Sequence, residues 1–112
     1  MSKKLKNYTL ILNATEKDRC NCVKWARQKA PKLPFGLWTI RDKKKIINSH
    51  KAKKGKVAIM NVGLPWGHVG IVYETHDNFI IIREANYKFC KITERAGTEK
   101  ELKILGYFDP KK

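Results

Sequence analysis

The pattern of apolar and polar positions in the first half of the chain predicts a helix followed by a loop. Asp18 or Asn21 can cap this helix, because either side chain can accept hydrogen bonds from the first helical N–H groups. Pro31 and Pro34 end it, since proline lacks the N–H that a helix interior requires. The apolar side of the helix consists of Val23, Trp25, Ala26 and Ala30. A weaker period predicts a second helix over residues 39–48, with one face formed by Ile40, Lys44 and Ile47.

The second half of the chain has the shorter period of β-strands. Apolar runs alternate there with residues that favour turns, and residues 75–78 (Thr-His-Asp-Asn) are typical of a hairpin turn. We predict strands over residues 57–60, 68–73, 79–83, 89–93 and 102–108. Helices that precede an antiparallel meander indicate an α+β fold, with N-terminal helices packed on an antiparallel β-sheet.

Length and composition predict a single domain over residues 1–112, because a chain of 112 residues with 42% hydrophobic content can bury a core without cross-links. The apolar run over residues 8–12 is shorter than the core of a signal peptide and ends without a convincing cleavage site. No stretch approaches the ~18 apolar residues of a transmembrane helix. We therefore expect a monomer without signal peptide or membrane span, cytoplasmic in the cell that produces it.

Positive charge is concentrated in the first half of the chain. Residues 1–56 contain 17 Lys and Arg against 3 Asp and Glu, whereas residues 57–112 contain 8 against 7, and the formal net charge is +15. Such an asymmetry attracts polyanions, which include nucleic acid, anionic lipid and anionic cell-wall polymers. For any single lysine cluster, a solvated surface that only aids solubility is an equally good interpretation.

Three cysteines, Cys20, Cys22 and Cys90, leave at least one thiol unpaired, which argues against a disulfide scaffold. Cys22 stands where the first helix is predicted to begin. Backbone N–H groups and the helix dipole lower the pKa of a thiol there, and the same N–H groups can bind the oxyanion formed when a thiolate attacks an amide. An inert buried cysteine is one alternative. A zinc site made by the three cysteines and a histidine is a weaker one, because Cys-x-Cys is not the usual ligand spacing.

A histidine and an acid at strand ends complete a candidate catalytic site. His68 begins a predicted strand, and Gly70 on the same face leaves room for another group to approach. On the paired strand, alternation places Glu84 and Asn86 at the end of an apolar stripe. Either side chain can accept the second ring N–H of His68, orient the ring and stabilise the imidazolium. Alternatively, Glu84 only pairs with a surface lysine.

These residues together resemble the CHAP family, the cysteine- and histidine-dependent amidohydrolases and peptidases of the papain-like NlpC/P60 group. The resemblance runs from about residue 20 to residue 110. Its most specific parts are the helix with a cysteine and an aromatic residue and the Gly-His-Val-Gly-Ile-Val strand. The matching segments are 21–26, 56–60, 67–72, 81–86 and 104–110.

The resemblance implies a papain-like fold and a cysteine hydrolase that cleaves amide bonds without a metal or an organic cofactor. The implied nucleophile, base, orienting residue and accessory polar group are Cys22, His68, Glu84 and Asn86, in that order. Asn21 would help to form the oxyanion hole. Trp66, in a Pro-Trp turn that departs from the family pattern, would gate the cleft or simply pack.

The family typically cleaves peptidoglycan, as an N-acetylmuramoyl-L-alanine amidase or as an endopeptidase, and the activity expected here is of the phage-lysin kind. Peptidoglycan, an anionic cell-wall polymer, is then the expected partner, reached by lysis, injection or a dedicated secretion route. The alternative is a catalytically silent papain-fold module whose basic N-terminal half binds nucleic acid or another polyanion. Three aromatic residues lie among its lysines, without a recognition motif for nucleic acid: Trp25, Phe35 and Trp38.

Overall fold

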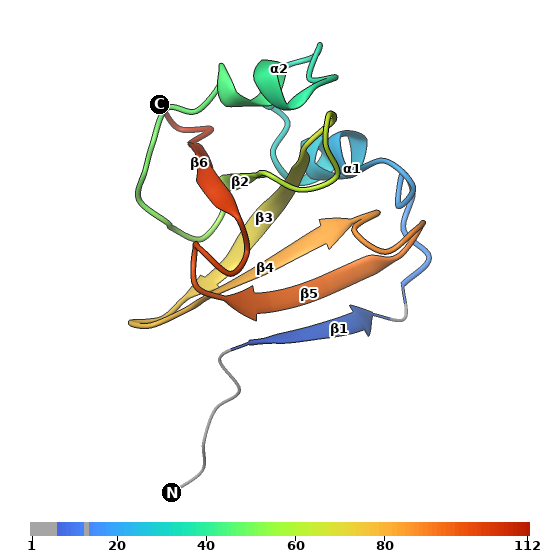
Figure 1. Cartoon of the computed structure of the whole chain (residues 1–112). Coiled ribbons are helices and arrows are strands. Elements are labelled where there is room, and N and C mark those ends of the chain that lie inside the picture. Colours follow the sequence, from blue (N-terminus) through green and yellow to red (C-terminus); the bar gives the residue numbers. More distant parts are fainter. Residues whose placement is uncertain (1–6, 13) are drawn as a thin grey trace, which may run out of the picture.

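The computed structural model describes residues 7–12 and 14–112. A six-stranded antiparallel sheet forms its centre, and two short helices lie beside the sheet (Figure 1), so the chain is α+β as predicted. The strands lie side by side in the order β1-β5-β4-β3-β2-β6. Their bounds are Tyr8–Leu12 (β1), Val57–Met60 (β2), His68–Thr75 (β3), Ile80–Ala85 (β4), Ile92–Gly97 (β5) and Ile104–Phe108 (β6). Within the described residues, no helix has the length and apolar character that a membrane span requires.

Two strands differ from the prediction in an informative way. Strand β5 begins at Ile92 instead of residue 89, because residues 86–91 form a turn in which Asn86 and Cys90 have positive φ angles. Strand β1 lies in the half that was predicted as helix and loop, so a strand precedes the helices. Its pairing with β5 joins Tyr8 to Ala96, a contact between the two ends of the chain that no local pattern encodes.

Helix α1 (Cys22–Lys29) starts close to its predicted position and packs on β3 and β4. Asn21, and not Asp18, is its N-cap, because the Asn21 side chain accepts the backbone N–H of Lys24 at 3.0 Å. Figure 1 shows that the first turn of this helix lies near the start of β3 and the end of β4. Residues from three distant parts of the sequence therefore meet on one side of the sheet.

Helix α2 (Ile40–Lys44) is much shorter than the second predicted helix. A turn follows the helix, and the end of the predicted range joins the sheet instead, because the backbone N–H of Asn48 donates to the carbonyl oxygen of Tyr107 in β6, at 3.0 Å. Of the predicted apolar face, Ile40 and Ile47 do pack against the core, but the position of the lysine is wrong. Lys43 is the buried lysine of this helix, whereas Lys44, predicted on the apolar face, is exposed.

The central strands of the sheet are buried on both faces. Successive side chains of a strand point in opposite directions, so each face carries its own apolar cluster. On one face, α1 packs against the central strands in a cluster that includes Trp25, Ala26, Val57, Ile59 and Val69. The other face carries a second apolar cluster, which includes Ala58, Met60, Ile80, Ile82 and Tyr107.

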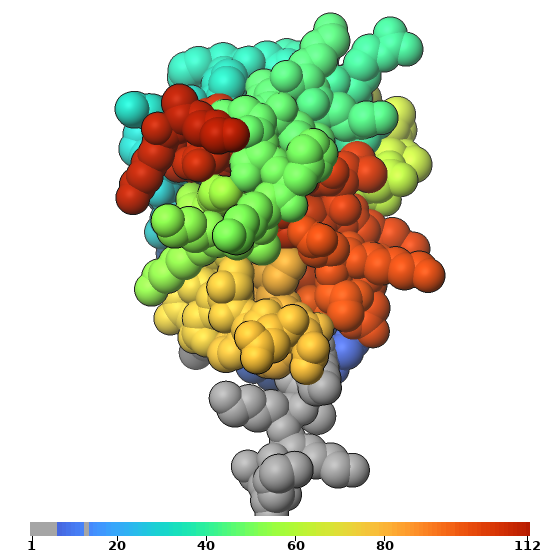
Figure 2. All heavy atoms as spheres, turned by 90° about the vertical axis from the view of Figure 1, so that its left-hand side faces the viewer, coloured from blue at the N-terminus to red at the C-terminus, as the bar shows by residue number. Residues whose placement is uncertain are grey.

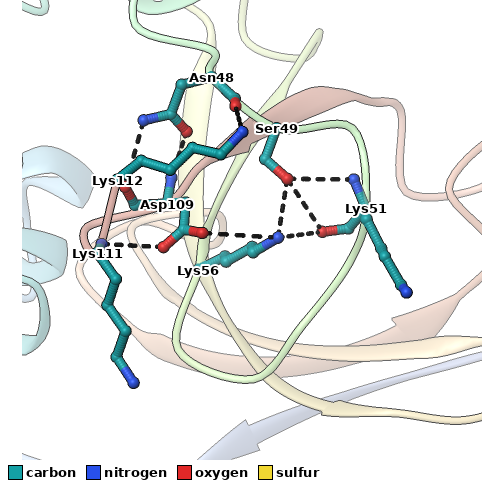
Figure 3. Close-up of polar contacts among 7 residues, drawn as sticks. All are labelled: Asn48, Ser49, Lys51, Lys56, Asp109, Lys111 and Lys112. Carbon is teal, nitrogen blue, oxygen red and sulfur yellow. Dashed lines mark hydrogen bonds and ion pairs between the residues drawn. The ribbon is translucent and has the colours of Figure 1, made fainter.

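Polar contacts hold the end of the chain against the segment that follows α2 (Figure 3). The Asn48 side chain accepts the backbone N–H of Asp109 at 2.7 Å, and the ammonium of Lys112 donates to the Asn48 carbonyl oxygen at 2.6 Å. The buried ammonium of Lys56 donates to the Ser49 hydroxyl at 2.8 Å and lies 3.9 Å from the Asp109 carboxylate. The C-terminal lysines are thereby placed beside residues 48–56.

Candidate active site

Cys22 is the first residue of α1, and its thiol is free and partly buried. The sequence prediction of a thiol at a helix start is therefore confirmed. At this position the backbone N–H groups of the first turn point away from the helix without intrahelical partners. The side-chain oxygen of Asn21 caps the helix, and its backbone N–H donates to the Asp18 carbonyl oxygen at 2.9 Å. Asn21 can still present its side-chain amide to the cleft.

His68 lies next to Cys22 and Glu84. Its Nε2 is 2.9 Å from Oε1 of Glu84, which leaves Nδ1 as the ring nitrogen for the hydrogen bond with the Cys22 thiol. The strand register places Gly70 opposite Glu84, and a Cβ on Gly70 would come within 3.2 Å of the Glu84 Cβ. Gly70 therefore gives the Glu84 side chain space to reach His68, as the sequence predicted.

Two residues that sequence reasoning missed surround the carboxylate of Glu84, which is 0% exposed. The hydroxyl of Thr93 donates to its Oε2 at 2.9 Å. Arg95 donates to both oxygens, from Nε to Oε2 at 2.6 Å and from Nη2 to Oε1 at 2.8 Å. Thr93 and Arg95 stand two residues apart and therefore share one face of β5, but Arg95 fell outside the predicted strand 89–93. The acid of the site is therefore part of a buried ion pair with arginine.

Asn86 has a different role from Glu84. It follows β4 with a φ angle of 64°, and its side-chain oxygen accepts the backbone N–H of Cys90 at 2.7 Å. This contact stabilises the turn between β4 and β5. Of the two candidates for orienting His68, it is Glu84 that makes the contact, whereas Asn86 lines the cleft nearby.

Burial and neighbouring charges shift the pKa values of Cys22, His68 and Glu84 in opposite directions. Desolvation raises the pKa of the Cys22 thiol, but the hydrogen bond and charge of His68 outweigh it and hold that pKa below its usual value. Desolvation lowers the pKa of His68, whereas its hydrogen bonds with Cys22 and Glu84 raise it, in sum to about 9. For Glu84, desolvation is again outweighed, here by Arg95 and His68, so its pKa stays low. The site favours a thiolate–imidazolium pair beside an ionised carboxylate.

A cleft of about 630 Å³ opens above Cys22 and His68. Asn21 and Trp66, which were predicted at the oxyanion hole and at the cleft, line it together with Cys22, and so does Asn86, the predicted accessory polar group. The aromatic residues of its wall are at least partly exposed and comprise Phe35, Trp38, Trp66 and Tyr87. The charged residues that line it besides His68 are all cationic, namely Lys24, Arg27 and Lys43. The cleft therefore suits a substrate with apolar and anionic parts.

The other two cysteines form a disulfide, Cys20–Cys90, which joins the approach to α1 to the turn after β4. The sequence did not predict this pairing, because the odd number of cysteines argued against a disulfide scaffold. A cross-link over a sequence separation of 70 restricts the unfolded chain and stabilises the fold by about 4 kcal/mol in the chain-entropy model. Two of the three thiols needed for the zinc alternative are thus consumed. The described residues also contain no group of three or more His, Cys, Asp and Glu placed to hold a metal.

Comparisons of the chain with protein-family models, with curated proteins and with solved structures find no match. The function of the site is therefore argued from its geometry and from the motifs of the sequence.

Proposed function

We propose that the chain is a papain-like cysteine hydrolase that cleaves amide bonds, with Cys22 as nucleophile and His68 as base. The observation that carries this proposal is that His68, held by Glu84 at 2.9 Å, lines the same open cleft as the free thiol of Cys22 and lowers the pKa of that thiol against its desolvation. A nucleophile, a base and a group that orients the base are what acyl transfer to a thiol requires.

In this mechanism the proton has moved from Cys22 to His68 before the substrate is attacked. The thiolate adds to the amide carbonyl, and the backbone N–H of Cys22 and the side-chain amide of Asn21 bind the oxyanion. His68 then donates its proton to the leaving amine, and a thioester remains on Cys22. His68 next takes a proton from water, which hydrolyses the thioester. Glu84 holds the ring in place and stabilises its positive charge in both halves of the reaction.

Peptidoglycan is the substrate that we propose, cut either between N-acetylmuramic acid and L-alanine or within its peptides. The cleft lining fits such a substrate, because aromatic side chains offer apolar contact area and the cationic residues attract carboxylates. The Cys20–Cys90 disulfide is consistent with action outside a reducing cytosol, after lysis, injection or secretion.

The direct test is incubation of the purified protein with peptidoglycan of several wall types, with turbidity and released amines as measurements. We expect new amino termini, and their identity names the bond that is cleaved. Absence of release from every wall type, together with tight binding to the same polymers, would favour the catalytically silent polyanion-binding module instead.

A basic surface of the protein is further evidence for an anionic polymer as the partner. Figure 2 shows residues 44–56, in green, beside the C-terminal end of the chain, in dark red. We define this surface by its exposed lysines, which are Lys44, Lys45, Lys51, Lys53, Lys54, Lys111 and Lys112. Asp109 lies among them, but it is partly buried and engaged by Asn48 and Lys56. The positive charge of this surface is therefore largely uncompensated.

Activity on a wall polymer is expected to fall about tenfold between low and 0.5 M salt, because exposed charges are screened at distances beyond ~4–5 Å at that ionic strength. Hydrolysis of a small neutral amide should change little over the same range. In a variant with Lys51, Lys53 and Lys54 replaced by glutamine, the salt dependence on the polymer should become shallower. Equal salt profiles for the polymer and the small amide would show that the basic surface does not steer the substrate.

A further inference from the structure

Lys43 of α2 is a buried cation that the mechanism above does not use. Its side chain is only 2% exposed in a residue type that rarely leaves the surface. The ammonium donates to the carbonyl oxygens of Leu37 at 2.9 Å and Trp66 at 2.8 Å, and the carbonyl oxygen of Trp38 lies at 3.5 Å. These three partners are neutral, so the positive charge remains available to act on its surroundings.

The partners of Lys43 belong to two segments that form the wall of the cleft. One segment carries Trp38, which is 75% exposed, and the other carries Trp66, which is 60% exposed. The backbone also joins α2 to the second segment, because the N–H of Ile40 donates to the Pro65 carbonyl oxygen at 2.9 Å. A single ammonium group thus connects both tryptophan-bearing segments.

Lys43 also lines the same cleft as Cys22. The charges that lower the pKa of the Cys22 thiol, against its desolvation, are that of His68 from β3 and, with a smaller effect, that of Lys43 from α2. Desolvation by burial lowers the pKa of Lys43, and the Cys22 thiolate and the neighbouring Asp42 carboxylate act against this by favouring the charged form. A positive charge at this place favours the thiolate form of Cys22.

We propose that Lys43 is a positioning residue of the active site, whose ammonium holds the two tryptophan-bearing segments in place and stabilises the Cys22 thiolate. The part that concerns substrate affinity rests on the proposed hydrolase function, whereas the part that concerns the thiolate does not.

The test compares Lys43→Met with Lys56→Met. Lys56 is a matched control, because it is also a buried lysine, 9% exposed, whose ammonium donates to the Ser49 hydroxyl and the Lys51 carbonyl oxygen, both at 2.8 Å. It is not among the residues that line the cleft. A merely structural role of Lys43 would make the two variants alike, with a loss of stability and no specific change at Cys22.

The first measurement is the rate of Cys22 alkylation by iodoacetamide as a function of pH. For Lys43→Met we expect the curve to move to higher pH, with alkylation about three- to tenfold slower on the acid side of the wild-type midpoint. Lys56→Met should keep the wild-type curve. On the substrate that the wild type hydrolyses, Lys43→Met should raise KM several-fold more than Lys56→Met does.

A second variant, Lys43→Gln, separates charge from hydrogen bonding and decides the question if Lys43→Met fails to fold by circular dichroism. Glutamine keeps two N–H donors for the carbonyl oxygens but carries no charge. We expect it to shift the alkylation curve and to leave KM closer to the wild-type value. Alkylation curves that coincide for the wild type and Lys43→Gln would overturn the electrostatic role. If the curve shifts but the wild type hydrolyses no amide, the proposed function fails and the role of Lys43 stands.

Discussion

Replacement of Cys22 by alanine is expected to reduce amide hydrolysis by at least about a thousandfold, because in the proposed mechanism the thiolate forms the covalent intermediate and an alanine side chain cannot. The fold should persist, since the thiol is only partly buried and alanine is a good helix former at this position. The measurement is the release of amines from the substrate by wild type and variant at equal concentration.

The control for this prediction must leave Cys22 as the one thiol in the chain. A Cys20→Ser/Cys90→Ser double variant does so, whereas Cys20→Ala alone would free the thiol of Cys90. The double variant should unfold at a lower temperature, with up to about 4 kcal/mol less stability, yet retain activity at low temperature. Activity that survives in Cys22→Ala, or that disappears only in the double variant, would exclude Cys22 as the nucleophile.

Replacement of Arg95 by methionine is expected to have the second largest effect. Arg95 and Glu84 are both buried, and loss of one partner leaves an uncompensated charge, which costs about 3–5 kcal/mol. Activity should fall as well, because Glu84 would no longer be held against His68. Urea denaturation and hydrolysis rates measure the two effects separately.

Arg83 offers a closely matched control for Arg95. Each arginine pairs with a glutamate and stacks on a tyrosine, Arg83 with Glu94 and Tyr73 and Arg95 with Glu84 and Tyr87. The Arg83 side chain is 36% exposed and outside the cleft lining, so Arg83→Met should cost about 1 kcal/mol or less and leave hydrolysis unchanged. Similar losses of activity in the two variants would mean that Arg95 acts only through general stability.

The same variant also predicts a change in acid stability. Desolvation by burial raises the pKa of Glu84, but the hydrogen bonds of Arg95 and His68 outweigh it. The pKa of Glu84 is therefore lowered in the folded protein. Its contribution to stability is therefore present above the unfolded pKa of about 4.5 and is lost as the pH falls through the folded pKa. Without Arg95 the folded pKa rises, so acid unfolding should begin at a higher pH. If the wild type and Arg95→Met begin to unfold at the same acid pH, Arg95 does not control the ionisation of Glu84.

Several features of this protein could be predicted from the sequence because they depend only on neighbouring residues. The caps and prolines around α1, the apolar runs of β2 to β4 and the glycine at position 70 act over a few residues, so their consequences can be predicted from the sequence alone. For the same reason the helix start at Cys22 and the strand start at His68 were predicted correctly. The resemblance to a hydrolase family supplied the expected roles of these residues.

Only the tertiary structure decided the remaining features, because each depends on a contact between distant residues. The pairing of β1 with β5 and the Cys20–Cys90 disulfide join opposite ends of the chain. The choice of Glu84 over Asn86 follows from the turn after β4, which diverts Asn86 to Cys90. Lys43 and Arg95 belong to residue types that are usually exposed, so the sequence alone predicts them on the surface. Their burial depends on partners that three-dimensional packing supplies, carbonyl oxygens for Lys43 and the Glu84 carboxylate for Arg95.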